Sequence, residues 1–189
     1  MRTRLHRETW LTTPPRACVP PLLRPWLTDP ASLTSRIRAR CTRFSVRVVE
    51  QCLGAAQLDE ADLLGLRPGE RVWVREVLLL ADDRPVVFGR SLLPLRNVRG
   101  AWNLFHGMGA RPLGAALFAD PAISRSPLAC KCFDARDARY HQARSALALH
   151  DPAVSVPCAV WARRSLFRRH GRALLVSEFF LPDIFELPP

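Results

Sequence analysis

The alternation of apolar and polar residues along the chain predicts one early strand and two β-hairpins. Residues 44–53 begin with an apolar side chain at every second position, which is the pattern of a half-buried strand. The segment 71–95 (RVWVREVLLLADDRPVVFGRSLLPL) contains two runs of strand-forming residues separated by a pair of aspartates, and it predicts a hairpin. Residues 158–168 and 173–181 predict a second hairpin around a histidine–glycine turn.

Capping residues and apolar spacing of three or four residues predict short helices between these strands. The predicted helical segments are 20–27 (a helix or a turn), 33–40 after a cap at Asp29 or Ser32, 58–66, 97–108, 112–121 and 137–149. One more strand is predicted over 124–135. Because hairpins pair antiparallel strands, this order indicates an α+β fold with a single antiparallel sheet of five or six strands. The helices at 97–108 and 112–121 form either a lid over a site or an ordinary packed pair.

The register of the central hairpin decides which arginines share a face of the sheet. With a two-residue loop at Asp82 and Asp83, Arg75 lies opposite Arg90, and both project from an otherwise apolar face. Two guanidinium groups on such a face are unfavourable unless an anion or a carboxylate lies between them, so this register predicts a buried anion site. With a three-residue loop, the two arginines would lie on opposite faces.

The second hairpin places Arg163 opposite Glu178, the only acid in its own strand, where Val176 and Phe180 share its face. A carboxyl group there is either neutralised by an arginine or has a raised pKa. Glu178 is therefore either a functional group or one half of a structural ion pair. If the two hairpins face the same way, one face of the sheet carries Arg75, Arg90, Arg163 and Glu178.

Length and charge limit the organisation and the partners of the protein. The 189 residues fit one domain over 20–189 preceded by a flexible arm over 1–19. The net charge of +11 favours a nucleic acid, an anionic membrane surface or a small polyanion. The arginines are spread along the chain without a block of five, which argues against a nucleic-acid partner. Lys131 is the only lysine, so almost all basic residues are arginines. This excess of arginine over lysine reflects either coding bias or the binding of carboxylates by planar guanidinium groups.

The cysteines and apolar runs indicate a cytoplasmic protein. Six cysteines are present without a recognisable signal peptide, so reduced thiols are expected. The Cys130-Lys131-Cys132 sequence does not have the spacing of a zinc or redox site, and no metal site is predicted. The longest apolar run, 77–81, is too short to cross a bilayer, so no integral membrane segment is predicted.

Four motifs give the chain a resemblance to a known family. They are VWVREVLLLADDRPVVFGRSLLP, RPLGAALF, WARRSLF and LLVSEFFLP, in this order within 26–182. Together they resemble chorismate pyruvate-lyase, which eliminates pyruvate from chorismate to give 4-hydroxybenzoate for ubiquinone biosynthesis. The resemblance implies a catalytic domain with one antiparallel sheet of about six strands, helical flaps over a buried site, and no metal or organic cofactor. The segment 124–157 is longer than in compact members, so no site residue is carried over there.

The resemblance also implies ligand contacts. The ligand-contacting arginine of the family's W-x-R-E pattern falls on Arg75, the leucine of its P-L-G pattern on Leu113, and the glutamate of its T/S-E-x-F-L-P pattern on Glu178. The family often has methionine at the position of Leu33, which suggests changed packing over the ligand. It often has glycine at the turn position of Asp83.

Chorismate carries one carboxylate on its ring and one on its enolpyruvyl ether, and desolvated arginines complement such a dianion. The predicted substrate contacts are Leu33, Arg75, Arg90, Leu113, Arg163 and Glu178, of which Arg75 and Glu178 are also predicted to be catalytic. We predict that Arg75 binds a carboxylate with support from Arg90. Glu178 would donate a proton to the departing enolpyruvyl group or form a hydrogen bond with the ring hydroxyl. The expected partners are chorismate and 4-hydroxybenzoate, and the protein is expected to be a monomer.

Two other functions are compatible with parts of the sequence. The ligand-binding domains of some bacterial transcription regulators share this lyase-like fold, so a non-catalytic sensor of small anions is an alternative. A regulator would carry a DNA-binding helix-turn-helix before this domain, and the Pro-rich arm is too short for one. A basic nucleic-acid binder is a third possibility, but here the arginines sit inside apolar strands and no aromatic-basic stripe occurs.

Overall fold

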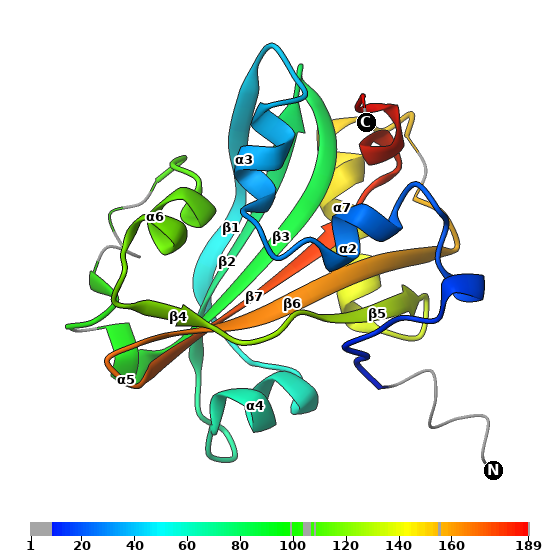
Figure 1. Cartoon of the computed structure of the whole chain (residues 1–189). Coiled ribbons are helices and arrows are strands. Elements are labelled where there is room, and N and C mark those ends of the chain that lie inside the picture. The colour runs from blue at the N-terminus through cyan, green and yellow to red at the C-terminus, as the bar shows by residue number, and fades with distance from the viewer. Residues whose placement is uncertain (1–8, 99, 104–106, 108, 155, 189) are drawn as a thin grey trace.

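The computed structural model describes residues 9–98, 100–103, 107, 109–154 and 156–188. These residues form one antiparallel sheet of seven strands in the order β1-β2-β3-β7-β6-β4, and β5 also pairs with β6 (Figure 1). The strands are β1 Phe44–Gly54, β2 Val72–Ala81, β3 Arg84–Pro94, β4 Ile123–Arg125, β5 Ala129–Asp134, β6 Ala159–Arg169 and β7 Arg172–Phe180. The α+β class and the single antiparallel sheet are confirmed.

The sheet has more strands than predicted because one predicted strand is divided. The segment 124–135 contains β4 and β5, and the chain leaves the sheet between them at Ser126 and Pro127. Proline has no backbone N–H to donate to a neighbouring strand, which explains an interruption at this position.

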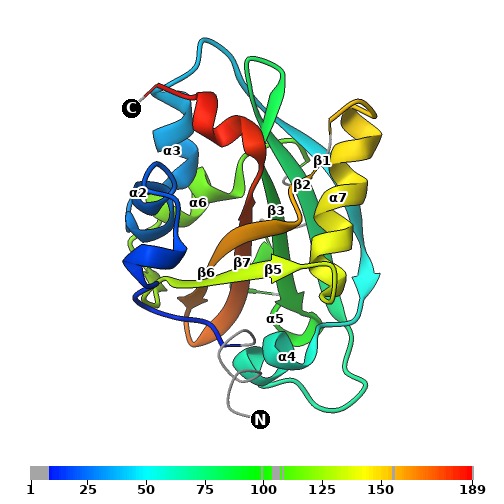
Figure 2. The ribbon, with the colours of Figure 1, turned by 90° about the vertical axis from the view of Figure 1, so that its right-hand side faces the viewer.

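Helices cover both faces of the sheet. They are α2 Arg24–Thr28, α3 Leu33–Arg38, α4 Leu58–Leu64, α5 Leu95–Val98, α6 Leu113–Ala119 and α7 Ala138–His150, with short 3₁₀ helices at Arg16–Cys18 and Pro182–Glu186. Figure 2 shows α2, α3 and α6 on one side of the sheet and α7 on the other. Strand β2 reflects this arrangement: Val77 and Leu79 belong to the core beneath α2 and α3, whereas Leu78 belongs to the core beneath α7.

Most predicted helices are present with shorter bounds. Ser32 caps α3, because its hydroxyl oxygen accepts a hydrogen bond from the backbone N–H of Ser35 at 3.3 Å. The predicted helix at 97–108 is only partly described, since residues 99, 104–106 and 108 lie outside the described residues. In the described part, α5 ends at Val98, and Gly100 has a φ of +89° that a helix does not allow.

Both hairpin turns have the predicted length. Asp82 and Asp83 form the first turn with φ of +49° and +66°, and His170 and Gly171 form the second with φ of +47° and +73°. Positive φ at both central residues is the conformation that a tight two-residue hairpin requires. The second hairpin keeps its register, so Arg163 pairs with Glu178 as predicted.

A β-bulge changes the register of the central hairpin. Leu80 pairs with Pro85 but Leu79 pairs with Val87, so one residue of β3 has no opposite residue. Because side chains alternate between faces, this extra residue moves the rest of β3 by one position. The predicted pairing of two arginines is therefore wrong: Arg75 lies opposite a serine, Arg90 lies opposite a glutamate, and the two guanidinium groups project from opposite faces.

The segment that precedes the domain makes contacts with it where it is described. Leu11 forms a β-bridge with Cys130, with backbone N···O distances of 2.8 and 2.7 Å. The Trp10 ring packs edge-on against Phe133 at 5.4 Å between centroids, and Val19 is buried. Residues 9–19 thus add to the core beside β5.

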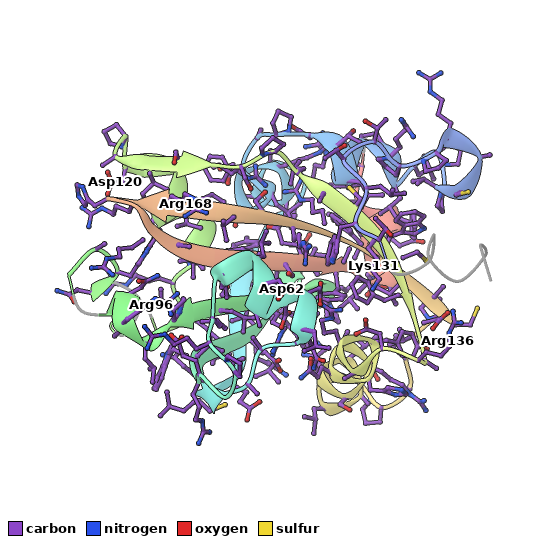
Figure 3. All side chains as sticks on the ribbon, turned by 90° about the horizontal axis from the view of Figure 1, so that it is seen from below. Asp62, Arg96, Asp120, Lys131, Arg136 and Arg168 are labelled. Carbon is purple, nitrogen blue, oxygen red and sulfur yellow. The ribbon has the colours of Figure 1, made fainter. Side chains whose placement is uncertain are left out.

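Basic side chains are distributed over the molecule. Figure 3 labels Arg96, Lys131, Arg136 and Arg168, which lie apart on α5, on β5, before α7 and on β6. No helix among the described residues is long and apolar enough to span a membrane.

Candidate active site

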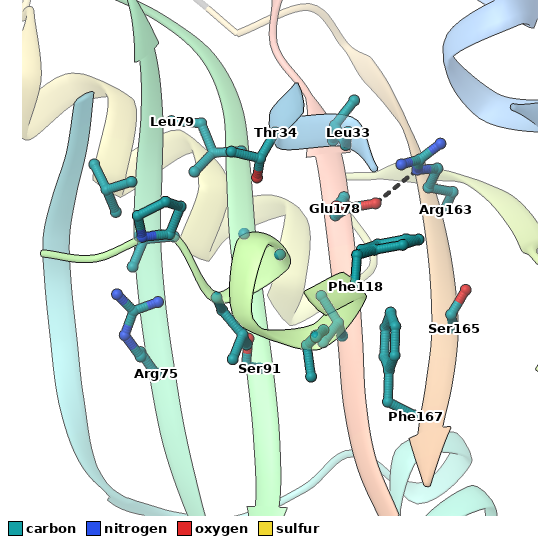
Figure 4. Close-up of a pocket in the computed structure, with 18 of the residues that line it drawn as sticks. Leu33, Thr34, Arg75, Leu79, Ser91, Phe118, Arg163, Ser165, Phe167 and Glu178 are labelled. Atoms are coloured by element: carbon teal, nitrogen blue, oxygen red, sulfur yellow. Dashed lines mark hydrogen bonds and ion pairs between the residues drawn. The ribbon is translucent and has the colours of Figure 1, made fainter. Parts of the chain in front are cut away.

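A cavity lies between the sheet and the two helices that cover it, α3 and α6 (Figure 4). Strands β2, β3, β7 and β6 supply its floor, and Leu33 of α3 and Leu113 of α6 line it from the cover. Its free volume is about 50 Å³. Both leucines that the sequence suggested as apolar contacts are therefore at the cavity.

Two neighbouring rows of side chains cross the floor. Read from β2 through β3 and β7 to β6, the rows are Arg75–Ser91–Val176–Ser165 and Val77–Gly89–Glu178–Arg163. Arg75 and Glu178 therefore lie on strands separated by β3, and the axes of these strands are roughly 10 Å apart. This separation suits a six-membered ring that carries one polar group toward each residue.

Arg75 is a buried guanidinium without an anionic partner. Its side chain is 1% exposed, and its Nη2 donates hydrogen bonds to the backbone carbonyls of Gly109 at 2.8 Å and Arg111 at 3.3 Å. Its Nε is buried and has no hydrogen-bond partner among the described residues, none of whose carboxylates forms an ion pair with it. Burial lowers the pKa of Arg75. A carboxylate in the cavity would remove the cost of this buried charge.

Glu178 and Arg163 form an ion pair at the other end of the cavity. The Nε of Arg163 donates to Oε2 of Glu178 at 2.6 Å (dashed in Figure 4). The Nη1 of Arg163 donates to the backbone carbonyls of Trp26 at 2.8 Å and Asp29 at 2.9 Å. Of the two states predicted for the Glu178 carboxyl group, the structure has the one that is paired with an arginine. Arg163 is 1% exposed and largely occupied by these acceptors, so it positions Glu178.

Arg90 lies away from the cavity, on the other face of the sheet. Its Nη1 donates to Glu76 at 2.5 Å, and its Nε is 3.4 Å from an oxygen of Glu60. All three side chains are buried, and burial raises the pKa of Glu76 although the charge of Arg90 opposes the change. The structure thus provides no route for Arg90 to support Arg75.

The covering helices touch closely above the floor. A Cβ atom at Gly114 of α6 would lie 2.8 Å from Oγ1 of Thr34 in α3, closer than such atoms normally approach. Glycine at this position therefore allows α6 to lie against α3. The predicted lid segment does cover the cavity, through α6.

Arg125 of β4 also lines the cavity, and sequence reasoning missed it. It lies in the segment 124–157, where no family motif could be matched, and β4 is only three residues long. Sequence alone gave no sign that this short strand returns beside β6.

The described residues contain no group of three or more His, Cys, Asp or Glu side chains arranged to hold a metal ion. None of the six cysteines, all of which the structure describes, forms a disulfide. Burial raises the pKa of Cys130 to about 11, so this thiol is held in its neutral form.

Solved structures with a similar fold are ligand-binding domains of transcription regulators. One is the ligand-binding domain of a putative GntR-family regulator from Bordetella bronchiseptica, with a TM-score of 0.51 and 20% identity over 75% of this chain and 86% of that chain. Another is the effector domain of PhnF from Mycobacterium smegmatis, with a TM-score of 0.53 and 17% identity over 81% of this chain and 90% of that chain. At such identities the similarity establishes the fold alone.

Sequence comparison is more specific. The chain is 64% identical to a probable chorismate pyruvate-lyase of Aromatoleum aromaticum over 100% of both chains. It is 63% identical to a protein of the same description from Azoarcus sp. strain BH72, over 96% of this chain and 94% of that one. A third, from Nitrosospira multiformis, is 39% identical over 92% of this chain and 94% of its own. The family model described as chorismate lyase matches residues 4–187, and the chain therefore belongs to the chorismate lyase family.

Proposed function

We propose that this protein is a chorismate pyruvate-lyase that forms 4-hydroxybenzoate and pyruvate from chorismate, as a step of ubiquinone biosynthesis. The observation that carries the proposal is the buried, unpaired guanidinium of Arg75, in a covered cavity that also contains the ion pair of Glu178 and Arg163. An anionic ring compound between α6 and the sheet would contact both groups.

The reaction can be written without any added reagent. The bond between the ring carbon and the ether oxygen of chorismate breaks, and its electron pair goes to the oxygen. The neighbouring ring carbon, which bears the hydroxyl group, loses its C–H proton, and that electron pair completes the aromatic ring. The proton ends on the methylene carbon of the departing enolpyruvate, which becomes pyruvate. The protein must therefore hold the reactive conformer, exclude water and guide one proton.

We assign Arg75 to the ring carboxylate. A guanidinium group binds a carboxylate through charge-assisted hydrogen bonds, and the buried Nε of Arg75 is a donor that still needs an acceptor. Leu33 and Leu113 would then contact the ring from the cover and keep water away from it. The substrate carboxylate would turn an unfavourable buried charge into a buried ion pair.

We assign Glu178 to the ring hydroxyl, on the opposite side of the ring from the ring carboxylate. An ion-paired carboxylate retains acceptor sites, so Glu178 can accept a hydrogen bond from this hydroxyl while Arg163 holds it. That hydrogen bond fixes the ring hydroxyl, and with it the direction of the C–H bond at the carbon that must lose its proton. The alternative role for Glu178 is proton donation to the departing enolpyruvyl group.

A direct assay tests the proposed activity. Purified protein is mixed with chorismate in the presence of a chelator, and the absorbance of 4-hydroxybenzoate and the release of pyruvate are followed together. Equal amounts of both products are expected. Tight binding of chorismate without turnover would instead support the non-catalytic sensor.

Arg75→Met tests the assignment of Arg75. Loss of a charged hydrogen bond is typically worth about 1.5–3 kcal/mol, so the KM for chorismate should rise roughly tenfold to a hundredfold. The ligand-free variant should unfold at the same or a higher urea concentration, because methionine removes an uncompensated buried charge. Arg144→Met, at an exposed position of α7, is the control. An unchanged KM for chorismate in Arg75→Met would refute the assignment.

Glu178→Gln tests the other end of the ring. Loss of the charged acceptor should lower kcat/KM roughly tenfold to a hundredfold. A fall in kcat of roughly a hundredfold to ten-thousandfold would instead indicate proton transfer by Glu178. Retention of most of the turnover would mean that Glu178 serves only as the partner of Arg163.

That the protein acts as a monomer in the cytoplasm, with a flexible arm over 1–19, stays a prediction.

A further inference from the structure

Arg125 is a second guanidinium at the cavity that lacks an anionic partner. Its Nε donates to the hydroxyl of Ser165 at 2.8 Å, and its Nη1 donates to the backbone carbonyl of Pro30 at 2.6 Å. Both acceptors are neutral, and no carboxylate of the described residues lies within ion-pair distance of it. Its guanidinium carbon is 5.3 Å from the ring centroids of both Phe118 and Phe167.

These contacts hold Arg125 in one orientation. Two hydrogen bonds fix two of its nitrogens, and the two aromatic rings restrict the plane of the guanidinium. Burial is the largest cause that lowers the pKa of Arg125, and the more distant charges of Glu178 and Asp29 oppose this change. The side chain is thus prepared for an anion before one arrives, and it retains N–H donors to offer.

The charges around the cavity require a doubly negative ligand. Among the described residues that line it, the charged groups are Arg75, Arg125, Arg163 and Glu178. Arg163 and Glu178 neutralise one another, which leaves two uncompensated positive charges. A single carboxylate at Arg75 would balance only one of them.

The positions of these groups match the shape of the substrate. Arg125 is hydrogen-bonded to Ser165, which ends the row that begins at Arg75. The two guanidinium groups therefore approach the cavity from opposite ends of this row, on the same face of the sheet. Glu178 lies in the neighbouring row on β7, the strand next to that of Ser165. In chorismate, the ether oxygen is on the ring carbon next to the one that bears the hydroxyl. A substrate with its carboxylate at Arg75 and its hydroxyl at Glu178 can therefore direct its enolpyruvyl group toward Ser165 and Arg125, in one of the two orientations of its ring.

We infer that Arg125 binds the carboxylate of the enolpyruvyl group, the part of the substrate that leaves as pyruvate. The inference rests on the proposed function, since it takes chorismate as the substrate. As the ether bond breaks, the departing enolpyruvate gains negative charge next to this guanidinium, so Arg125 stabilises both the bound substrate and the leaving group. The aromatic product keeps only the ring carboxylate and makes no contact with Arg125.

This difference between substrate and product provides the test. Arg125→Gln should raise the KM for chorismate roughly tenfold to a hundredfold, the range expected for loss of a charged hydrogen bond, and should lower kcat. The same variant should bind 4-hydroxybenzoate within about twofold of the wild type, whereas Arg75→Met should weaken the binding of both compounds. Arg125→Lys keeps the charge and should recover a measurable part of the loss in KM. Arg168→Gln, at an exposed position of β6, is the matched control.

A binding experiment separates failure of this inference from failure of the proposed activity. The probes are 3-(carboxymethoxy)benzoate, which has a second carboxylate on an ether, and benzoate, which lacks it. The wild type should prefer the dicarboxylate, and Arg125→Gln should abolish the preference, whether or not the protein turns over chorismate. The inference would be overturned if Arg125→Gln weakened the binding of both probes equally, or if Arg125→Gln and Arg125→Lys bound the dicarboxylate with the same affinity.

Discussion

Gly114→Ala should separate the two helices that cover the cavity. The new methyl carbon would lie 2.8 Å from Oγ1 of Thr34 and 3.5 Å from its Cβ. Thr34 is 6% exposed and β-branched, so its side chain has few alternative rotamers. We expect α6 to move away from α3 by several tenths of an ångström, and Leu113 to move with it.

The size of the effect follows from two opposing contributions. Overpacking of a buried contact costs about 1–3 kcal/mol. Replacement of a helical glycine by alanine returns about 0.5–1 kcal/mol because the unfolded chain loses less entropy on folding. The free energy of unfolding should therefore fall by up to about 2.5 kcal/mol. Since Leu113 lines the cavity, kcat/KM should fall roughly tenfold, because catalytic geometry tolerates only small displacements.

Urea unfolding and initial rates with chorismate measure both quantities. The double variant Gly114→Ala/Thr34→Ala is the decisive control, because alanine at position 34 leaves only the Cβ at 3.5 Å, an ordinary contact. It should recover most of the stability and activity that Gly114→Ala loses, relative to Thr34→Ala alone. If Gly114→Ala by itself is more stable than the wild type and equally active, α3 and α6 are not in the close contact described above.

Three other substitutions test features outside the cavity. Asp83→Gly should raise the free energy of unfolding in urea by about 0.5–1 kcal/mol, because glycine adopts the observed φ of +66° without strain; a decrease would contradict the turn geometry. Arg90→Met should lower it by about 3–5 kcal/mol, because Glu76 stays buried without its ion-pair partner and Glu60 keeps only Arg139. The KM for chorismate of the folded protein should stay unchanged, and a large rise in KM would contradict the position of Arg90. Burial alone would raise the pKa of Asp59, but hydrogen bonds from its arginine neighbours hold this pKa below the ordinary value of 3.8. The ionised Asp59 therefore stabilises the fold above pH 3.8, and this contribution is lost as the pH falls through the lowered pKa. Asp59→Asn should thus be less stable than the wild type at pH 7 and approach it in acid, and a difference that persists in acid would show another origin.

Local signals in the sequence were sufficient to predict the two hairpins. The dipeptides at Asp82-Asp83 and His170-Gly171 mark both turns, and simple counting from the second turn gave the pairing of Arg163 with Glu178. This ion pair is the part of the site that sequence reasoning described correctly in detail. It succeeded because the second hairpin has no irregularity between its turn and the pair.

Two features depended on interactions that a single sequence does not display. The extra residue near Pro85 in β3 leaves no compositional signal, and yet it reverses the face on which Arg90 lies. Arg125 joins the cavity only because β4 returns to pair with β6, which is an interaction between distant segments. Both errors concern arginines. The role of an arginine depends on whether its guanidinium group is buried and whether a carboxylate pairs with it, and the residue type alone reveals neither.

The connection between α2 and α3 links the cover of the cavity to the charges inside it. The backbone carbonyls of Trp26 and Asp29 anchor Arg163, and that of Pro30 anchors Arg125. An outward swing of α3 that lifts this short connection would break the hydrogen bonds to Asp29 and Pro30, and it would loosen both guanidinium groups at once. Opening the cover would therefore also move the arginines inside the cavity, because the same short connection holds both. A cavity open to solvent would no longer hold its guanidinium groups in the positions that bind an anion.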